Sequence, residues 1–175
     1  IKATPQTTIA FDVQRILYGD VAAIANKGPT TAEFFGALTG VLTGNPAMIS
    51  NPLGNDNGWG FGWEDVTVYK LGVNYEYSNQ WTFRGGLNYA KNPIDSDQNL
   101  FNILAPGVVE THATVGFTYS PTAYNEISVT YMHAFDKKQS YSYRTDLGAP
   151  FGVVGYDTEI GMDQNALEIS YAMKF

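Results

Sequence analysis

Six segments of the chain alternate between apolar and polar residues with a period of two. This alternation is typical of a β-strand that has one apolar and one polar face. Each segment runs for about 10–13 residues, which exceeds the usual globular strand of about 5–6 residues and approaches a tilted membrane-spanning strand. The sequence therefore predicts an all-β fold with strands near residues 7–18, 65–78, 80–91, 110–119, 126–136 and 164–175.

The connections between these segments alternate between short and long. Ser78–Gln80 and Pro121–Asn125 are short and polar, as in tight turns. The long connections, expected to be loops, are residues 19–64, 92–109 and 137–162. Bacterial outer-membrane barrels place short turns on one side of the membrane and long loops on the other. We therefore predict part of an antiparallel up-and-down outer-membrane β-barrel. A soluble sandwich is the weaker alternative, because it gives no reason to sort loops by length.

One helix is predicted within the first long loop. Thr30 is followed three residues later by Glu33, which is a capping-box pattern, and apolar residues then recur at helical spacing. We expect a short helix near residues 31–42. Further along the loop, three aromatic residues alternate with glycine, and they fit an interfacial belt, a ligand gate or packing within the loop. They are Trp59, Phe61 and Trp63.

Composition narrows the class of protein. No apolar run approaches the ~20 residues that a membrane-spanning helix needs. The net charge of −7 opposes nucleic-acid binding, which depends on a basic surface. The chain has no cysteine, which excludes disulfides and cysteine-ligated zinc. Aromatic residues reach 14%, with 12 Tyr and 18 Gly, as the aromatic girdles and twisted strands of a barrel require.

No motif predicts catalysis. The chain has neither a G-x-S-x-G elbow nor an H-E-x-x-H motif, and its two histidines, His112 and His133, lie far apart. Asp95 and Asp97 loosely resemble a calcium loop but lack its glycine and its closing glutamate. We therefore predict no catalytic residue, no cofactor site and no metal site.

Ionisable residues on the polar faces are the candidates for a role inside a barrel. If these faces line a lumen, the side chains form a charged network there, and the plainer interpretation is a solvated, hydrogen-bonded interior. These lumen-facing candidates are Asp12, Arg84, Glu110, His112 and Glu168.

Three stretches resemble the C-terminal part of the FadL/TodX family of outer-membrane transporters. They are VTVYKLGVNYEYSNQWTFRGGLNYAKNPI, FNILAPGVVETHATVGFTYSP and QNALEISYAMKF. The opening TTIAFDVQRILYGDVAAIAN is similar to the strand and loop just upstream in the family. The most specific matches are a W-x-x-R-x-G-x-x-Y pattern from Trp81 to Tyr89 and a P-x-x-x-E-x-H pattern from Pro106 to His112.

The resemblance implies passive uptake of long-chain fatty acids and other hydrophobic compounds across the bacterial outer membrane. It implies no enzymatic activity and no cofactor, and a hydrophobic small-molecule ligand for the intact protein. The alternating C-terminus also resembles the signal that the barrel-assembly machinery reads. The residues of this expected assembly signal are Leu167, Ile169, Tyr171, Met173 and Phe175.

The resemblance also implies that further strands complete the barrel. A complete member of the family is a larger barrel with an N-terminal plug, and its ligand pockets depend largely on parts upstream of this segment. We therefore carry over no ligand-binding residue. About eight strands make the smallest ordinary barrel, so six are too few to close.

An open sheet leaves two unpaired edges, which invite pairing with other chains and are not tolerated in lipid. If this chain is ordered by itself, we expect edge-to-edge homo-oligomers in the form of a ring, tube or fibre. Two hypotheses follow. The chain is part of a transporter in contact with outer-membrane lipid or detergent, or it is a self-assembling structural subunit at the cell surface or outside the cell. An outer-membrane hydrolase is a third hypothesis with little support.

Overall fold

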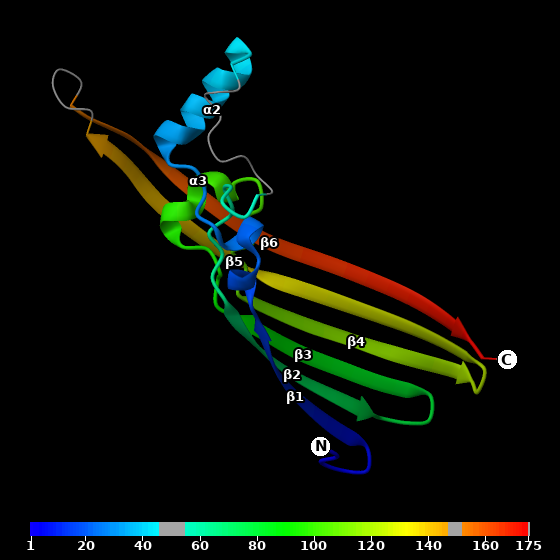
Figure 1. Cartoon of the computed structure of the whole chain (residues 1–175). Coiled ribbons are helices and arrows are strands. Elements are labelled where there is room, and N and C mark those ends of the chain that lie inside the picture. Colours follow the sequence, from blue (N-terminus) through cyan, green and yellow to red (C-terminus); the bar gives the residue numbers. More distant parts are fainter. Residues whose placement is uncertain (46–54, 147–151, 175) are drawn as a thin grey trace.

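The computed structural model describes residues 1–45, 55–146 and 152–174. Its strands form one antiparallel sheet in the order β1-β2-β3-β4-β5-β6, so each strand pairs with its neighbours in the chain (Figure 1). The predicted up-and-down sheet is confirmed. The strands are β1 Thr7–Ile16, β2 Val66–Glu76, β3 Trp81–Ala90, β4 Thr111–Thr122, β5 Asn125–Asp146 and β6 Val153–Met173.

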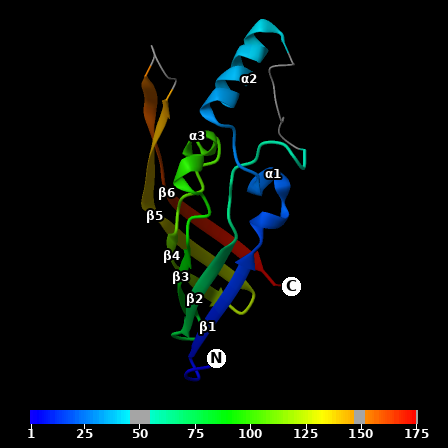
Figure 2. The same cartoon turned by 60° about the vertical axis from the view of Figure 1, so that its left-hand side comes forward.

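The helices lie in the long connections, at one end of the sheet (Figure 2). They are η1 Tyr18–Asp20, α1 Ala22–Ala25, α2 Thr31–Thr43, η3 Ser96–Gln98 and α3 Asn99–Asn102. The predicted helix near residues 31–42 is confirmed as α2. Its capping box is formed, because Thr30 Oγ1 accepts from the Glu33 backbone N–H and Glu33 Oε2 accepts from the Thr30 N–H. Gly44, with a φ of 67°, ends the helix in the left-handed conformation.

The sheet has two different faces, which we call outer and inner. Directly paired residues share a face, and the row Phe11, Leu71, Leu87 and Ala113 runs across four strands on the outer face. The next row, Asp12, Lys70, Asn88 and His112, lies on the inner face. The outer face is apolar and exposed, and the inner face is the one over which the loops fold.

Aromatic rings on the outer face gather at two levels. At the turn end, the ring of Trp81 stacks on that of Tyr119 with centroids 4.5 Å apart, next to Phe83. At the loop end, Tyr69 pairs with Tyr89. Along β3, Tyr89 lies eight positions after Trp81, or roughly 26 Å away. Two aromatic levels around an apolar band are the pattern of a strand wall that faces lipid.

The last two strands are longer than predicted. The expected strands 126–136 and 164–175 agree with the first half of β5 and the second half of β6, but the expected loop 137–162 is wrong. β5 continues to Asp146 and β6 begins at Val153, with register pairs up to Asp146↔Val153. A β-bulge between the pairs Ala134↔Gln164 and Lys137↔Met162 places two residues of β5 opposite one of β6. The extra residue reverses the alternation of β5, so the sequence pattern breaks at residue 136 although the strand continues.

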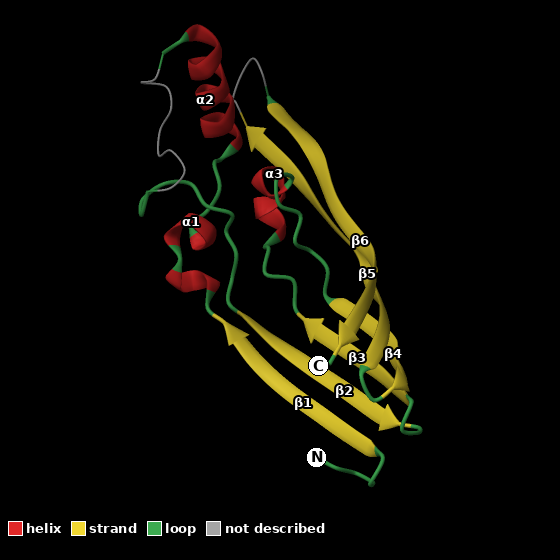
Figure 3. Cartoon of the chain, turned by 90° about the vertical axis from the view of Figure 1, so that its right-hand side faces the viewer, coloured by secondary structure: helices red, strands yellow, loops and turns green. Residues whose placement is uncertain are grey.

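We call Asn125–Ala134 with Gln164–Met173 the sheet half of this hairpin, and Lys137–Asp146 with Val153–Met162 the projecting half. The projecting half extends past the ends of the other four strands, and α3 lies beside it (Figure 3). A buried apolar cluster of the described residues forms there. It contains Ile94, Val108 and Ile160, with Trp63 and Met162 packed against it.

Candidate functional site

The inner face changes from polar to apolar toward the loops. Near the turns, Arg84 Nη1 donates to Thr118 Oγ1 over 2.6 Å, and the hydroxyls of Thr118 and Ser128 lie 2.7 Å apart. Near the loops, the paired positions carry aliphatic side chains instead. These side chains, with Met162 of β6, form a surface that we call the apolar patch. Its residues are Ile16, Val66, Val68, Ala90 and Met162.

A cavity of about 300 Å³ lies over the apolar patch. Loop residues, among them Tyr18, Trp63 and Pro93, form its walls. Val66 and Val68 of the patch are only 6% and 7% exposed. Lys91, His112 and Gln164 add polar groups at its margin. A mostly apolar cavity with a few polar groups is the usual form of a small-molecule site, and here it suits an apolar molecule with one hydrogen-bonding end.

Gln139 holds the loop 92–109 against the projecting half. Its Nε2 donates to the Ile94 carbonyl over 3.1 Å and to Asn99 Oδ1 over 2.8 Å, and its Oε1 accepts from Asn92 Nδ2 over 2.7 Å. Asn99 Nδ2 donates back to the Gln139 carbonyl over 2.9 Å. Asn92 and Asn99 are buried, so each bond satisfies a polar group that water does not reach.

Asn102 joins this loop to the earlier one. Its Oδ1 accepts from Trp63 Nε1 over 2.7 Å, and its Nδ2 donates to the Phe61 carbonyl over 2.7 Å. The ring of Phe61 also stacks on Phe101, with centroids 5.2 Å apart. Of the three interpretations open for this aromatic run, packing within the loop therefore describes Phe61 and Trp63. Trp59 lines a different cavity.

Glu110 forms a third link between the loop and β5. Its Oε2 accepts from Lys137 Nζ over 2.8 Å, and its Oε1 accepts from the Asn92 N–H over 3.1 Å. Burial acts to raise the pKa of Glu110, but these two hydrogen bonds and the charges of Lys137 and Lys91 outweigh it and hold the pKa below its ordinary value. Glu110 is therefore ionised at neutral pH.

The five lumen-facing candidates all lie on the inner side of the sheet. Asp12 and His112 belong to one transverse row, and Arg84 and Glu168 belong to another. Glu110 directly precedes β4 on the same face as His112. No hydrogen bond or ion pair in the described part of the chain joins two of the five. Their role in a lumen stays a prediction.

The partners of these candidates are neutral or oppositely charged neighbours. Asp12 lies 3.6 Å from Lys70 Nζ, which also donates to Gln14 Oε1 over 2.8 Å. His112 Nδ1 and Asn88 Oδ1, which are cross-strand neighbours, are buried, and within residues 1–45, 55–146 and 152–174 neither has a hydrogen-bond partner. The inner face therefore carries both hydrogen-bonded and unpaired polar groups among the described residues.

The predicted assembly signal lies on the outer face of β6. Leu167, Ile169, Tyr171 and Met173 are exposed there, and Phe175 lies outside the described residues. Its reading by an assembly machinery stays a prediction.

Sequence reasoning missed Gln139 and the asparagines bonded to it or near it. The bonds of Gln139 span about forty residues, so no local pattern reports them. One signal was available. After the bulge, Lys137, Gln139, Tyr141 and Tyr143 alternate again with smaller or charged residues, one residue out of phase with the preceding strand.

Membrane-spanning helices and metal-binding groups are both absent from the described residues. No helix among them is both long and apolar enough to cross a membrane. They also contain no group of three or more His, Cys, Asp or Glu side chains that could hold a metal ion.

Comparison with known proteins agrees with the architecture. The profile of the family described as outer membrane protein transport protein (OMPP1/FadL/TodX) matches residues 3–175. One relative is the long-chain fatty acid transport protein of Escherichia coli O6:H1 (strain CFT073), which is 28% identical over 72 residues. That match covers 41% of this chain and 16% of the relative's length. The chain therefore belongs to the OMPP1/FadL/TodX family of outer-membrane transport proteins, as the resemblance predicted.

Proposed function

We propose that the chain forms part of an outer-membrane channel for passive uptake of hydrophobic compounds such as long-chain fatty acids. The cavity over the apolar patch is the observation that carries this proposal. The wall of a water-filled lumen is expected to be polar, so buried valines on the inner face indicate a different role. Binding of an apolar substrate on these valines is favoured by roughly 25 cal/mol for each Å² of apolar surface that is buried.

Two further observations support the proposal. The outer face is apolar between two aromatic levels, which suits a wall in contact with lipid. The Escherichia coli relative is a long-chain fatty acid transport protein. In this proposal the alkyl chain lies on the apolar patch, and Lys91, His112 or Gln164 at the cavity margin meets a polar end group. The chain supplies no covalent chemistry.

A substitution in the apolar patch tests the proposal. Val68→Asp in the intact protein places a carboxylate against the substrate chain, and we expect uptake of a fluorescent long-chain fatty acid to fall about ten-fold or more. Asn74→Asp is the matched control, because Asn74 lies on the inner face of the same strand at its turn end, opposite Arg84. Both variants are first checked for assembly by heat-dependent gel mobility. Normal uptake by a correctly assembled Val68→Asp protein would contradict the proposal.

The unpaired edges favour a second candidate function. β1 and β6 end the sheet, and of the described residues only the isolated bridge Lys2↔Thr8 lies along the free side of β1. Exposed edges recruit other strands, so copies of this 175-residue segment would pair into a ring, tube or fibre. Electron microscopy of the purified segment without detergent separates the candidates. Regular assemblies would support a structural subunit, and particles seen only in detergent would leave transport as the function.

A further inference from the structure

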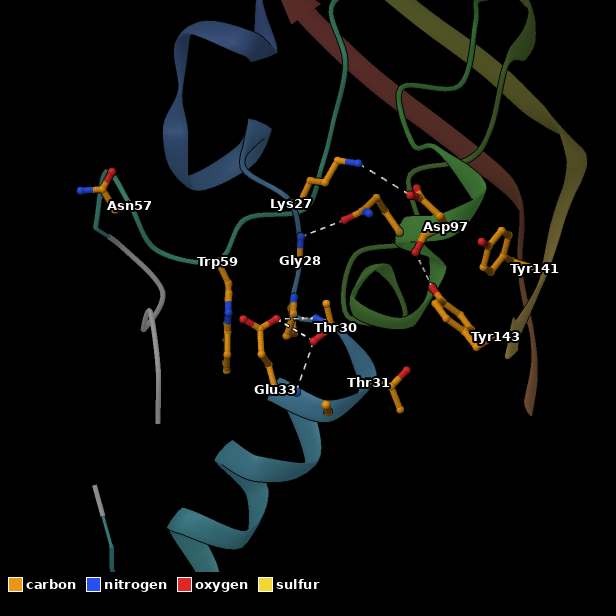
Figure 4. A pocket seen from close by; sticks show the side chains of 13 residues that line it. Lys27, Gly28, Thr30, Thr31, Glu33, Asn57, Trp59, Asp97, Tyr141 and Tyr143 are labelled. Carbon is orange, nitrogen blue, oxygen red and sulfur yellow. Dashed lines mark hydrogen bonds and ion pairs between the residues drawn. The ribbon is translucent and has the colours of Figure 1, made fainter. Parts of the chain in front are cut away.

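A second cavity lies among the loops. It occupies about 630 Å³ between the start of α2, the turn before Trp59, η3 and the projecting half of β5 (Figure 4). It shares no lining residue with the cavity over the apolar patch. Its walls come from the loops and from the inner face of β5 beyond the bulge, whereas no residue of β1, β2 or β3 lines it. Nothing in the proposed transport function uses it.

The walls of this second cavity are richer in polar and aromatic side chains than those of the cavity over the apolar patch. Hydrogen-bond donors and hydrogen-bond acceptors line it together with three aromatic rings. The polar side chains include Lys27, Glu33, Asn57, Asp97 and Gln98, and the rings are those of Trp59, Tyr141 and Tyr143. An alkyl chain placed here would separate the polar groups from water without offering them partners, which costs free energy. The lining therefore selects against the substrate proposed for the apolar patch.

Two polar atoms of the lining residues are buried without partners. Within the described residues, Trp59 Nε1, which only donates, and Asp97 Oδ1, which only accepts when ionised, have no hydrogen-bond partner. The other Asp97 oxygen lies 3.8 Å from Lys27 Nζ, beyond hydrogen-bonding distance (Figure 4). Turning either group toward the cavity therefore breaks no hydrogen bond, and a ligand hydroxyl that accepts from the indole or donates to the carboxylate satisfies it.

The rest of the wall is held in place by bonds that do not involve the cavity. Tyr143 donates its hydroxyl to the Asp97 carbonyl over 2.7 Å and accepts from the Leu100 N–H over 3.0 Å. Gln98 Oε1 accepts from the Gly28 N–H over 2.8 Å, and Glu33 is engaged in the capping box of α2. Walls that are fixed before a ligand arrives reduce the entropy lost on binding.

From these observations we infer that this cavity is a binding site for a neutral saccharide. A sugar hydroxyl both donates and accepts, so it matches the mixed wall. The apolar C–H face of a sugar ring can lie against the aromatic side chains, which combine an apolar body with a polar tip. Anionic ligands are disfavoured, because Glu33 and Asp97 outnumber the single ammonium of Lys27. The sugar is either a free oligosaccharide or a glycan anchored in the membrane.

The test uses the intact ¹⁵N-labelled protein in detergent micelles. Methyl glucoside, methyl galactoside and N-acetylglucosamine are titrated while the indole N–H signals are followed. The Trp59 signal is identified by its loss in Trp59→Phe. We expect at least one sugar to shift it saturably in the millimolar range while the Trp63 signal, whose N–H is bonded to Asn102, stays in place. No saturable shift with any of the three sugars would overturn the inference.

A matched pair of variants locates the site. Asp97→Ala is expected to weaken sugar binding about five-fold, the worth of one hydrogen bond. Asp95→Ala, two residues away on an exposed side chain that does not line the cavity, is expected to leave binding unchanged. Equal loss in both variants, or displacement of the sugar by oleate, would overturn the inference. Lipopolysaccharide in vesicles, compared with the free sugars, identifies which source binds. Because Val68 lies elsewhere, loss of uptake and loss of sugar binding are independent results.

Discussion

The two halves of the β5–β6 hairpin share one backbone ladder and have opposite surfaces. In the sheet half, the outer face is apolar, with Val129 paired to Ile169 and Tyr131 paired to Leu167. In the projecting half, the outer face is charged. Lys138 lies 3.6 Å from Glu159, and Arg144 lies 2.9 Å from Asp157. The inner face changes in the opposite sense. In the sheet half it carries polar residues such as Thr130 and Glu168, and in the projecting half its residues pack against the loops.

This contrast teaches that the surroundings, not strand propensity, decide the pattern of each half. A face against hydrocarbon must be apolar, and a face in water carries charge at little cost. The change occurs within one residue pair of the bulge between Ala134 and Lys137. The bulge therefore lies at the level where the apolar wall ends. The loops fasten to the inner side of the hairpin just beyond that level, through Gln139.

The largest effect should come from putting a charge on the outer face of the sheet half. Ile169→Arg replaces a side chain that is 69% exposed in this chain and faces lipid in the proposed barrel. We expect a loss of about 2–4 kcal/mol in the free energy of unfolding if the residue lies near the bilayer midplane. Urea unfolding of the intact protein in lipid vesicles measures this loss.

Ser142→Arg is the control for that prediction, because Ser142 lies on the outer face of the projecting half. Its cost should stay within about 0.5 kcal/mol. Equal costs for the two arginines would show that both halves meet the same surroundings, and the contrast would fail.

A smaller effect should follow from removing the loop anchor. Gln139→Leu leaves Asn92 Nδ2, Asn99 Oδ1 and the Ile94 carbonyl without partners, at a cost of about 1–3 kcal/mol. Because these groups belong to the loop, we expect hydrogen exchange to rise in residues 92–109 while the sheet half stays protected. Ser140→Leu, on the opposite face of β5, should leave the loop protected. Uniform loss of protection over all six strands would contradict a local anchor.

The smallest effect should be the pH dependence of the loop contact. The pKa of Glu110 is lower in the folded protein than in the unfolded chain, so the pair with Lys137 stabilises the loop above the unfolded-state pKa. This contribution is lost as the pH falls through the lowered pKa. The Trp63 indole signal, read over an acidic pH series, should report the loosening of the loop.

Glu110→Gln should flatten the part of that pH response that belongs to Glu110, because the amide does not titrate. A response of the same size in the variant would assign the pH dependence to other carboxylates. Asp157 is one such carboxylate, because hydrogen bonds from Ser142 and Arg144 lower its pKa. It lies on the outer face of the projecting half, opposite to the face of Glu110.

The sheet half could be predicted from the sequence, and the projecting half could not. Leu167, Ile169 and Tyr171 alternate with smaller or polar residues because, over these positions, the outer side of the sheet is apolar and the inner side is polar. Beyond Ala134 the bulge shifts β5 by one residue, so Gln139, Tyr141 and Tyr143 continue the inner face at odd positions. A search for one uninterrupted period ends at that shift. The helix α2 was predictable because Thr30 and Glu33 are local partners.

The sites depend on contacts that the sequence pattern does not carry. The apolar patch combines Ile16 of β1 with Met162 of β6, which the topology brings to one end of the inner face. The period-two pattern of a strand does not show at which position the inner-facing residues change from polar to apolar. The wall of the second cavity joins Trp59 to Tyr143 across more than eighty positions, and only the folded loops bring them together.

The bulge joins the projecting half to the rest of the sheet, so a bend at the bulge displaces the far end of this half, which we call the arm. Ten residue pairs beyond the bulge, at about 3.3 Å each, give an arm roughly 30 Å long, so a bend of about 10° at the base moves the tip by about 5 Å. Deleting Asp136 would leave Lys137 opposite Met162 and every side chain on its present face, while removing the bulge and the local bend that bulges impose on a strand. The residues on each face of the arm and the direction in which the arm points are therefore separate properties. Deletion of a single residue changes the direction and keeps the residues on each face.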